Sequence, residues 1–238
     1  MVSALFPLRL ENAEMRRSGR VLVGPVNLEL LGEETTVIIG PNGAGKTSLL
    51  KLMHGIGRLS GGRIIWACSI DKARYRQSFV FQTPIIMRRT VLKNLIYPLI
   101  LRGQSRPTAE TLCKEVAEQT GLTGVLGRDA LSLSGGEKQK LALARALIVK
   151  PEVLFLDEPC AVLDGRSTRE IEDILKQVAK VGTCLIMTTH NIGQAQRLAD
   201  NVVFLLGGRV HECTKARDFF NAPQTTEATM FLNGDIVE

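Results

Sequence analysis

Hydrophobic residues along the chain form short continuous runs, separated by longer segments in which apolar residues recur at helical spacing. The continuous runs predict three buried strands, at residues 35–39, 153–156 and 184–188. The helical spacing predicts three helices, at residues 46–54, 137–149 and 168–180. Strands that alternate with helices in this way are typical of a mostly parallel sheet with helices on both faces.

Other segments depart from this alternation. Residues 21–30 alternate around Gly24 and Pro25, which predicts an antiparallel strand pair with residues 8–12. Residues 90–131 carry apolar residues only at helical spacing, so we expect an inserted helical lobe at about residues 84–150. The segment 219–238 predicts a tail with one short helix beginning near Thr225. The chain, residues 1–238, is therefore predicted to form one domain.

The composition is ordinary for a globular protein, with 45% hydrophobic and 23% charged residues. Apolar runs are shorter than the ~20 residues that span a bilayer. The apolar start at Ala4 is interrupted by Pro7 and Arg9, unlike a signal peptide, so we expect a cytoplasmic protein. Five scattered cysteines without a Cys-x-x-Cys pair favour reduced packing residues. The net charge of +6 is spread along the chain and fits either a solvated surface or contact with a membrane-bound partner.

A glycine-rich loop, GPNGAGKT at residues 40–47, stands between the predicted strand 35–39 and the predicted helix 46–54. Glycines let successive backbone N–H groups point at phosphate oxygens, at the positive end of the helix that follows. Lys46 places a charge on the β- and γ-phosphates, and the Thr47 hydroxyl is a ligand for Mg²⁺. The predicted ATP-binding residues of the loop are Gly40, Pro41, Asn42, Gly43, Ala44, Gly45, Lys46, Thr47 and Ser48.

Two adjacent carboxylates follow the predicted strand 153–156. Asp157 stands where a carboxylate can hold Mg²⁺ through water. Glu158 is expected to face the γ-phosphate and to orient or deprotonate the attacking water. These positions predict Glu158 and Lys46 as catalytic residues and Asp157 as a metal ligand.

The sequence LSGGEKQ, residues 133–139, precedes the predicted helix 137–149. Ser134, Gly135 and Gly136 there leave free backbone N–H groups at a helix N-terminus, which suits a phosphate as well as an ordinary helix cap. The chain already has one phosphate loop. A second phosphate-facing helix end is therefore explained if it serves the nucleotide of a neighbouring subunit.

Together, GPNGAGKT, LSGGEKQ and a strand ending in Asp-Glu-Pro resemble the ATP-binding-cassette ATPases over essentially the whole chain. The resemblance implies a P-loop core with an N-terminal antiparallel β subdomain and an inserted helical lobe, and two copies that enclose two ATP molecules. It also implies that His190 contacts the γ-phosphate and is catalytic. By the same resemblance, Gln82 reaches Mg²⁺ and water, and Asp164 belongs to the loop that crosses the dimer interface.

The family commonly places an aromatic residue under the adenine, and counting back from Lys46 this position falls near Arg17. A guanidinium plane can stack on a base, so Arg17 is a candidate ATP contact. An exposed Arg17 without any nucleotide contact is the alternative.

The resemblance also implies partners. Cassettes of this length work with separate transmembrane permease subunits, on the cytoplasmic side of the plasma membrane, and here the permease is expected to contact residues 81–101. Three segments, residues 81–89, 158–161 and 234–238, resemble tungstate-type oxyanion importers fed by an extracytoplasmic substrate-binding protein. Phosphate, molybdate and polar amino acids remain alternative cargoes, and an exporter subunit is the alternative direction. A nucleic-acid-linked cassette and a P-loop kinase are less favoured, so no nucleic-acid partner is expected.

Overall fold

The computed structural model describes residues 5–237. Ala4 and Glu238, which entered the arguments on the N-terminus and on the tail, lie outside the described residues. The strands of the described part are β1 Leu8–Arg17, β2 Arg20–Leu30, β3 Thr36–Ile39, β4 Gly61–Trp66, β5 Gln77–Val80, β6 Val153–Asp157, β7 Cys184–Thr188, β8 Asn201–Leu206 and β9 Arg209–Lys215. The helices are α1 Lys46–His54, α2 Ile70–Tyr75, α3 Val91–Leu101, α4 Arg106–Gln119, α5 Gly135–Leu147, α6 Gly165–Lys180, α7 Ile192–Leu198, α8 Ala216–Asn221 and α9 Thr226–Asn233, with short 3-10 turns at Thr123–Val125 and Ala130–Ser132.

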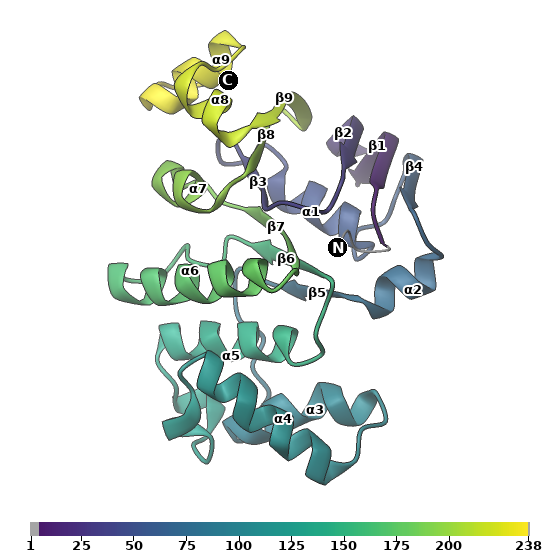
Figure 1. Cartoon of the computed structure of the whole chain (residues 1–238). Coiled ribbons are helices and arrows are strands. Elements are labelled where there is room, and N and C mark those ends of the chain that lie inside the picture. The colour runs from purple at the N-terminus through teal and green to yellow at the C-terminus, as the bar shows by residue number, and fades with distance from the viewer. Residues whose placement is uncertain (1–4, 238) are drawn as a thin grey trace.

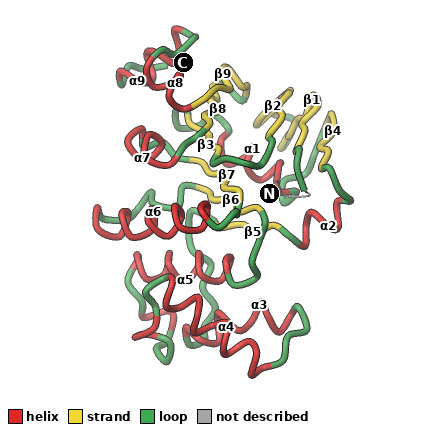
Figure 2. Tube along the Cα trace, in the orientation of Figure 1, coloured by secondary structure: helices red, strands yellow, loops and turns green. Residues whose placement is uncertain are grey.

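The central sheet has six strands in the order β5-β6-β7-β3-β8-β9 (Figures 1 and 2). All neighbouring pairs are parallel except β8 and β9, which form an antiparallel hairpin. The three strands predicted as buried are β3, β6 and β7, and every residue of them is buried. Continuous apolar runs therefore correctly indicated strands that are covered on both faces.

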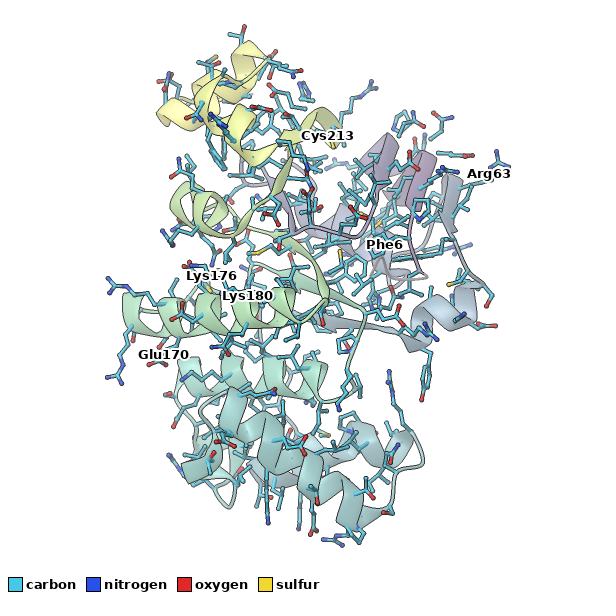
Figure 3. The ribbon with its side chains drawn as sticks, viewed as in Figure 1. Phe6, Arg63, Glu170, Lys176, Lys180 and Cys213 are labelled. Atoms are coloured by element: carbon cyan, nitrogen blue, oxygen red, sulfur yellow. The ribbon has the colours of Figure 1, made fainter. Side chains whose placement is uncertain are left out.

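Helices cover the two faces of this sheet separately. On one face, Leu49 and Leu52 of α1 pack in a cluster with Ile38 of β3. On the other face, residues of α5, α6 and α7 pack with Val37 and Ile39 of the same strand. Neighbouring residues of a strand point to opposite faces, so α1 and α5 are separated by the sheet. The outer side of α6 carries exposed lysines, Lys176 and Lys180 (Figure 3).

A second sheet, antiparallel in the order β2-β1-β4, packs beside α1. It confirms the predicted pairing of residues 8–12 with residues 21–30, and the structure extends that pairing to Arg17 and Arg20. The sequence did not predict β4, whose partner is the other edge of β1. With the central sheet, this subdomain confirms the predicted fold class.

Helices α3, α4 and α5 form a lobe at one end of the molecule (Figure 1). The lobe has its own apolar cluster, in which Val91 and Leu95 of α3 meet Cys113 and Val116 of α4 and Leu141 of α5. Between residues 90 and 131, all of them described, the only β pairing is an isolated bridge of Thr90 with Asp129. The inserted helical lobe is therefore confirmed, whereas the boundary at about residues 84–150 stays a prediction.

The C-terminal segment is more ordered than the predicted tail. Its expected short helix is α9, but Phe219 belongs to a separate helix, α8, and is fully buried. The rings of Phe219 and Phe231 pack against Phe204 of β8, with centroids 5.8 and 5.4 Å away. The segment thus completes one face of the central sheet. Within residues 5–237, no helix combines the length and the apolar character that a membrane span requires.

Candidate functional site

The glycine loop and the predicted residues that follow β5, β6 and β7 lie at one edge of the central sheet. In a parallel sheet the carboxyl ends of all strands lie at the same edge, where ligands of α/β proteins bind. The glycine loop follows β3, Asp157 and Glu158 stand at the end of β6, and His190 follows β7 after one residue. Gln82 lies at the same edge, because it follows the end of β5, the neighbour of β6, after one residue.

The glycine loop has a shape that two of its residues can adopt only as glycine. Gly40 has a φ of 153° and its Cα lies against the carbonyl oxygen of Leu205, with no room for a Cβ. Gly45 has a φ of 98°, and a Cβ there would lie 2.7 Å from the carbonyl oxygen of Leu22. The backbones of β2 and β8 therefore pack directly against the glycine loop. The loop leads into the first turn of α1, whose N–H groups have no partner within the helix.

Lys46 is buried under this loop, with a side chain 6% exposed. Its Nζ donates to the carbonyl oxygens of Gly40, at 2.8 Å, and Pro41, at 3.0 Å, and lies 3.9 Å from Oε1 of Glu158. Burial lowers the pKa of Lys46 from its usual value, and the nearby charges of Glu158 and Asp157 oppose that shift. The Lys46 ammonium group is therefore poorly solvated, and an anionic ligand would stabilise its charge.

Asp157 is held by two hydroxyl groups. Thr47 Oγ1 donates to Asp157 Oδ1 at 2.8 Å, and Thr188 Oγ1 donates to the same oxygen at 2.9 Å. The carboxylate is 3% exposed, so these bonds fix its orientation. The link to Thr47 places the acid at the end of β6 directly against the start of α1.

The Glu158 side chain faces His190 and Lys46 rather than the hydroxyl groups that hold Asp157. Its Oε2 lies 2.8 Å from Nδ1 of His190, and its side chain is only 12% exposed. The backbone at Glu158 has a φ of 44°, and its N–H donates to Thr188 Oγ1 at 3.0 Å. The structure therefore brings Lys46, Glu158 and His190 together around one point.

Thr188 is a site residue that sequence reasoning missed. It donates to Asp157 and accepts from the N–H of Glu158, so it fixes both acids at once. The only sequence signal was its place at the end of β7, two residues before His190. A threonine at the end of a buried strand does not by itself reveal that its hydroxyl group serves the neighbouring strand.

Ser134 and Glu137 form a capping box at the start of α5. The Ser134 side chain accepts from the N–H of Glu137 at 3.3 Å, and Glu137 Oε2 accepts from the N–H of Ser134 at 2.8 Å. The backbone bond from Ser134 lowers the pKa of Glu137. Ser134 and Gly135 are exposed, and among the described residues no hydrogen bond or ion pair joins residues 134–136 to residues 40–48. The N-terminal end of α5 therefore lies at the surface, away from the glycine loop of the same chain.

Three further predicted residues, Asp164, Arg17 and Gln82, are exposed. Asp164 caps α6, where its Oδ1 accepts from the N–H of Ser167 at 2.7 Å. Arg17 is the last residue of β1, at the turn to Arg20, and so belongs to the second sheet, which packs on α1. Within the described part of the chain, neither Arg17 nor Gln82 makes a side-chain hydrogen bond or ion pair. Their assignment to the nucleotide therefore stays a prediction.

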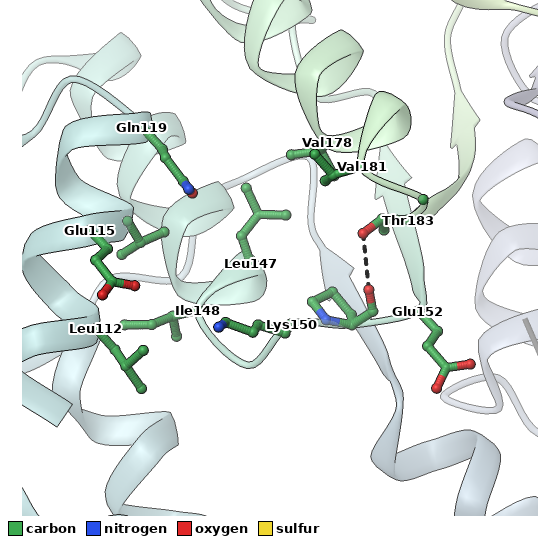
Figure 4. Close-up of a pocket in the computed structure, with 13 residues that line it drawn as sticks. Leu112, Glu115, Gln119, Leu147, Ile148, Lys150, Glu152, Val178, Val181 and Thr183 are labelled. Carbon is green, nitrogen blue, oxygen red and sulfur yellow. Dashed lines mark hydrogen bonds between the residues drawn. The ribbon is translucent and has the colours of Figure 1, made fainter. Parts of the chain in front are cut away.

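One cavity lies away from this site. A space of about 390 Å³ opens between α4, the end of α5 and the end of α6, and Figure 4 shows Leu112, Leu147, Lys150, Val178 and Thr183 around it. Lys150 precedes β6 and Thr183 precedes β7, so the cavity lies at the amino ends of these strands. None of the predicted site residues lines it.

The oxygen ligands at the nucleotide edge suit Mg²⁺. The Thr47 hydroxyl and the Asp157 carboxylate meet at 2.8 Å beside the phosphate loop, and hard oxygen donors are what Mg²⁺ prefers. No group of three or more His, Cys, Asp or Glu residues with metal-binding geometry occurs among residues 5–237. Mg²⁺ in nucleotide sites takes only one or two protein ligands beside phosphate and water, so this donor set fits it.

The fold and the glycine loop define the chain as a P-loop nucleotide-binding protein. A model of the ABC transporter family matches residues 23–161, more than half of the chain. The tungstate uptake system ATP-binding protein TupC of Peptoclostridium acidaminophilum is 36% identical over 86% of this chain and 97% of its own length. The L-cystine transport system ATP-binding protein TcyN of Escherichia coli is 32% identical over 94% of this chain and 96% of its own length.

Solved structures agree with these sequence matches. The structure of cbiO1 from Clostridium perfringens, part of the transporter complex cbiONQ, has a TM-score of 0.81 at 26% identity and covers 96% of this chain and 95% of that chain. The dimeric ATP-binding cassette MJ0796 bound to ADP and Pi has a TM-score of 0.78 at 25% identity, over 88% of this chain and 99% of that chain. The chain belongs to the ABC transporter family and is an ABC ATPase.

Proposed function

We propose that this chain is the ATP-hydrolysing subunit of an ABC importer, and that it works as a dimer. The observation that carries the proposal is the meeting of Lys46, Glu158 and His190 at the mouth of the glycine loop. The family match and relatives that are ATP-binding proteins of uptake systems support the same function.

Hydrolysis follows from the positions of these groups. ATP phosphates bind to the N–H groups of the loop, and Lys46 exchanges its carbonyl partners for phosphate oxygens. Glu158 orients a water molecule and takes its proton as the water oxygen bonds to the γ-phosphorus and the bond to the β–γ bridging oxygen breaks. His190 holds the Glu158 carboxylate. Mg²⁺, when bound by Thr47, Asp157 and Gln82, would neutralise phosphate charge.

The second half of each ATP site comes from another copy. The free helix start of α5 lies on the opposite face of the sheet from α1, so it cannot serve the nucleotide of its own glycine loop. Ser134, Gly135 and Gly136 would contact the γ-phosphate bound by the partner, and the exposed Asp164 would cross the same interface. That the related cassette MJ0796 is dimeric supports this arrangement.

A permease helix is the partner that fits the side of the molecule near residues 81–101. A groove of about 570 Å³ is lined there by Phe81, Ile85, Met87 and Tyr97, and by Arg145 of α5. Ile85 is 57% and Tyr97 41% exposed, so apolar surface is available for contact. Through this contact the chain would lie on the cytoplasmic side of the membrane and receive cargo from an extracytoplasmic binding protein.

Tungstate or a related oxyanion is the cargo we favour, because TupC is 36% identical to this chain. ATP-binding proteins of iron, phosphate and amino acid transport systems also occur among the relatives, so kinship alone does not select the cargo. Cargo therefore has to be tested on the whole assembly.

Tagged Glu158→Gln protein, purified from detergent-solubilised native membranes in ATP, tests the proposal. We expect it to retain a multi-spanning permease, whose binding protein is then titrated with tungstate, molybdate and phosphate. Glu118→Gln, an exposed change on α4, serves as the matched control that still hydrolyses ATP. A permease without a binding protein would indicate export. Purification without any membrane protein, with ATPase activity stimulated by DNA or RNA, would overturn the transport function.

A further inference from the structure

A buried carboxylate outside the nucleotide site joins two helices. Glu172 of α6 is 2% exposed. Arg197 of α7 donates to it twice, from Nε to Oε2 and from Nη2 to Oε1, both at 2.7 Å. The Gln194 side chain donates to the same Oε1 at 3.5 Å. A bidentate pair of this kind fixes the relative orientation of the two helices.

Glu172, Gln194 and Arg197 are connected to His190 through the first turn of α7. Helix α7 begins two residues after His190, and Asn191 caps it by accepting from the N–H of Gln194 at 2.9 Å. The N–H of Asn191 in turn donates to Thr189 Oγ1 at 3.1 Å. The backbone of His190 is thus held between the end of β7 and the first turn of α7. The position of that turn depends on the contacts of Gln194 and Arg197 with Glu172.

The same three residues are connected to Glu158 through the loop that leaves β6. Cys160 is two residues beyond Glu158, and it packs against the apolar cluster that contains Ala195 and Leu198 of α7. Burial raises the pKa of the Cys160 thiol to about 11, and the nearby Gln194 side chain opposes that shift. The loop that leaves β6 therefore lies against the helix that follows His190 and carries Gln194.

We propose that Glu172, Gln194 and Arg197 are positioning residues that set the contact between His190 and Glu158. The 2.8 Å separation of His190 Nδ1 and Glu158 Oε2 requires β6, β7 and α7 to keep a fixed relation. Displacements of about 1 Å in a catalytic group can lower a rate by ~10²-fold. The inference rests on the proposed roles of Glu158 and His190 in hydrolysis.

Two variants that keep the side-chain size test the pair. Glu172→Gln removes the charge and Arg197→Lys removes the bidentate geometry. We expect each to lower kcat for ATP at least about tenfold with KM changed less than about twofold, because neither residue touches the glycine loop. Asp173→Asn, an exposed neighbour on α6, is the matched control. Folded variants with unchanged kcat, or with a change in KM alone, would overturn the proposal.

A loss of folding in either variant does not end the test. Only the Glu172 carboxylate of the pair is buried, because the Arg197 side chain is 49% exposed. Replacing a buried charge and its partner by apolar residues of similar size often preserves stability, so Glu172→Met with Arg197→Met supplies a folded protein without the pair. We expect this double variant to keep a Tm close to that of the wild type and to keep the low kcat. A double variant with wild-type kcat would show that the pair serves only stability.

A double-mutant cycle with His190→Ala separates positioning from a general effect. If Glu172 acts through His190, adding Glu172→Gln to His190→Ala lowers kcat no further. Independent, multiplying losses would refute a role through His190. If His190→Ala alone keeps wild-type kcat, the proposed catalytic role of His190 is refuted. If His190→Ala loses activity but Glu172→Gln keeps wild-type kcat, only the positioning proposal is refuted.

Discussion

His54 makes the stability of this protein depend on pH. It ends α1 and lies between the rings of Phe79 and Phe155, each with its centroid 5.3 Å away. Its Nδ1 is buried without a hydrogen-bond partner. Burial lowers the pKa of His54 from 6.5 to about 4. The helix C-terminus favours a cation by only about 0.3–1 kcal/mol, too little to offset this burial.

The sign and size of the effect follow from proton linkage. The unfolded chain binds a proton at His54 near pH 6.5, whereas the folded protein does so only near pH 4. Stability is therefore complete above about pH 6.5 and is lost as the pH falls toward about 4. Between about pH 8 and pH 5 the two pKa values give a loss of about 2 kcal/mol in the free energy of unfolding.

His54→Phe isolates this term. A phenylalanine ring is of similar size, packs with Phe79 and Phe155, and does not titrate. Urea unfolding of wild type and variant, at about pH 8 and pH 5, measures the difference. At a slope of about 1–3 kcal/mol per M, the wild-type midpoint should fall by roughly 0.7–2 M more than that of the variant. Other titrating groups are common to both proteins and cancel.

Equal losses in the two proteins would refute the reasoning. That outcome would mean that His54 takes up its proton in the folded protein as readily as in the unfolded chain. A larger loss in the variant than in the wild type would contradict the sign of the shift as well.

Three further predictions concern the nucleotide site. Glu158→Gln should lose at least about 10²-fold in phosphate release, while ATP still raises its Tm. Gly136→Ala should lower Tm by roughly 2–10 °C, because its Cβ would lie 2.6 Å from Ser167 Oγ and 3.1 Å from Ser167 Cβ. Adding Ser167→Ala should restore part of that loss, and Gly135→Ala, with nothing within 4 Å, should leave Tm unchanged. Arg17→Ala should weaken ATP binding in a titration, and an unaltered Kd would remove Arg17 from the site.

The sequence correctly predicted the strand, the loop and the helix at residues 35–54 because their signals are local. The glycine loop needs a strand before it and a helix after it, and all three lie within residues 35–54. Buried strands such as β6 are visible as continuous apolar runs. The same locality explains the misses: β4 is a six-residue edge strand whose residues are mostly not buried, so it lacks such a run.

Contacts between distant residues could not be predicted from one sequence. Glu172 occupies a charged position on a helix that also carries exposed lysines, and its partner Arg197 is 25 residues away. Thr188 lies 31 residues from Asp157. The sequence does not show which partner a charged side chain or a hydroxyl group contacts in the folded protein. The structure was therefore required to identify the roles of Glu172 and Thr188.

Asp157 and Glu158 are neighbours in the chain with different chemical environments. Asp157 accepts two hydroxyl hydrogen bonds at one oxygen, which fix the orientation of a carboxylate suited to a metal ion. Glu158 lies instead between His190 and Lys46, with Oε2 at 2.8 Å from His190 Nδ1 and Oε1 at 3.9 Å from Lys46 Nζ. The turn that separates them begins at the left-handed backbone of Glu158 and is fixed by Thr188. Because the two carboxylates have separate partners, the proposed function gives them separate roles, in which Asp157 would hold the metal ion at the phosphates and Glu158 would take the proton of the water.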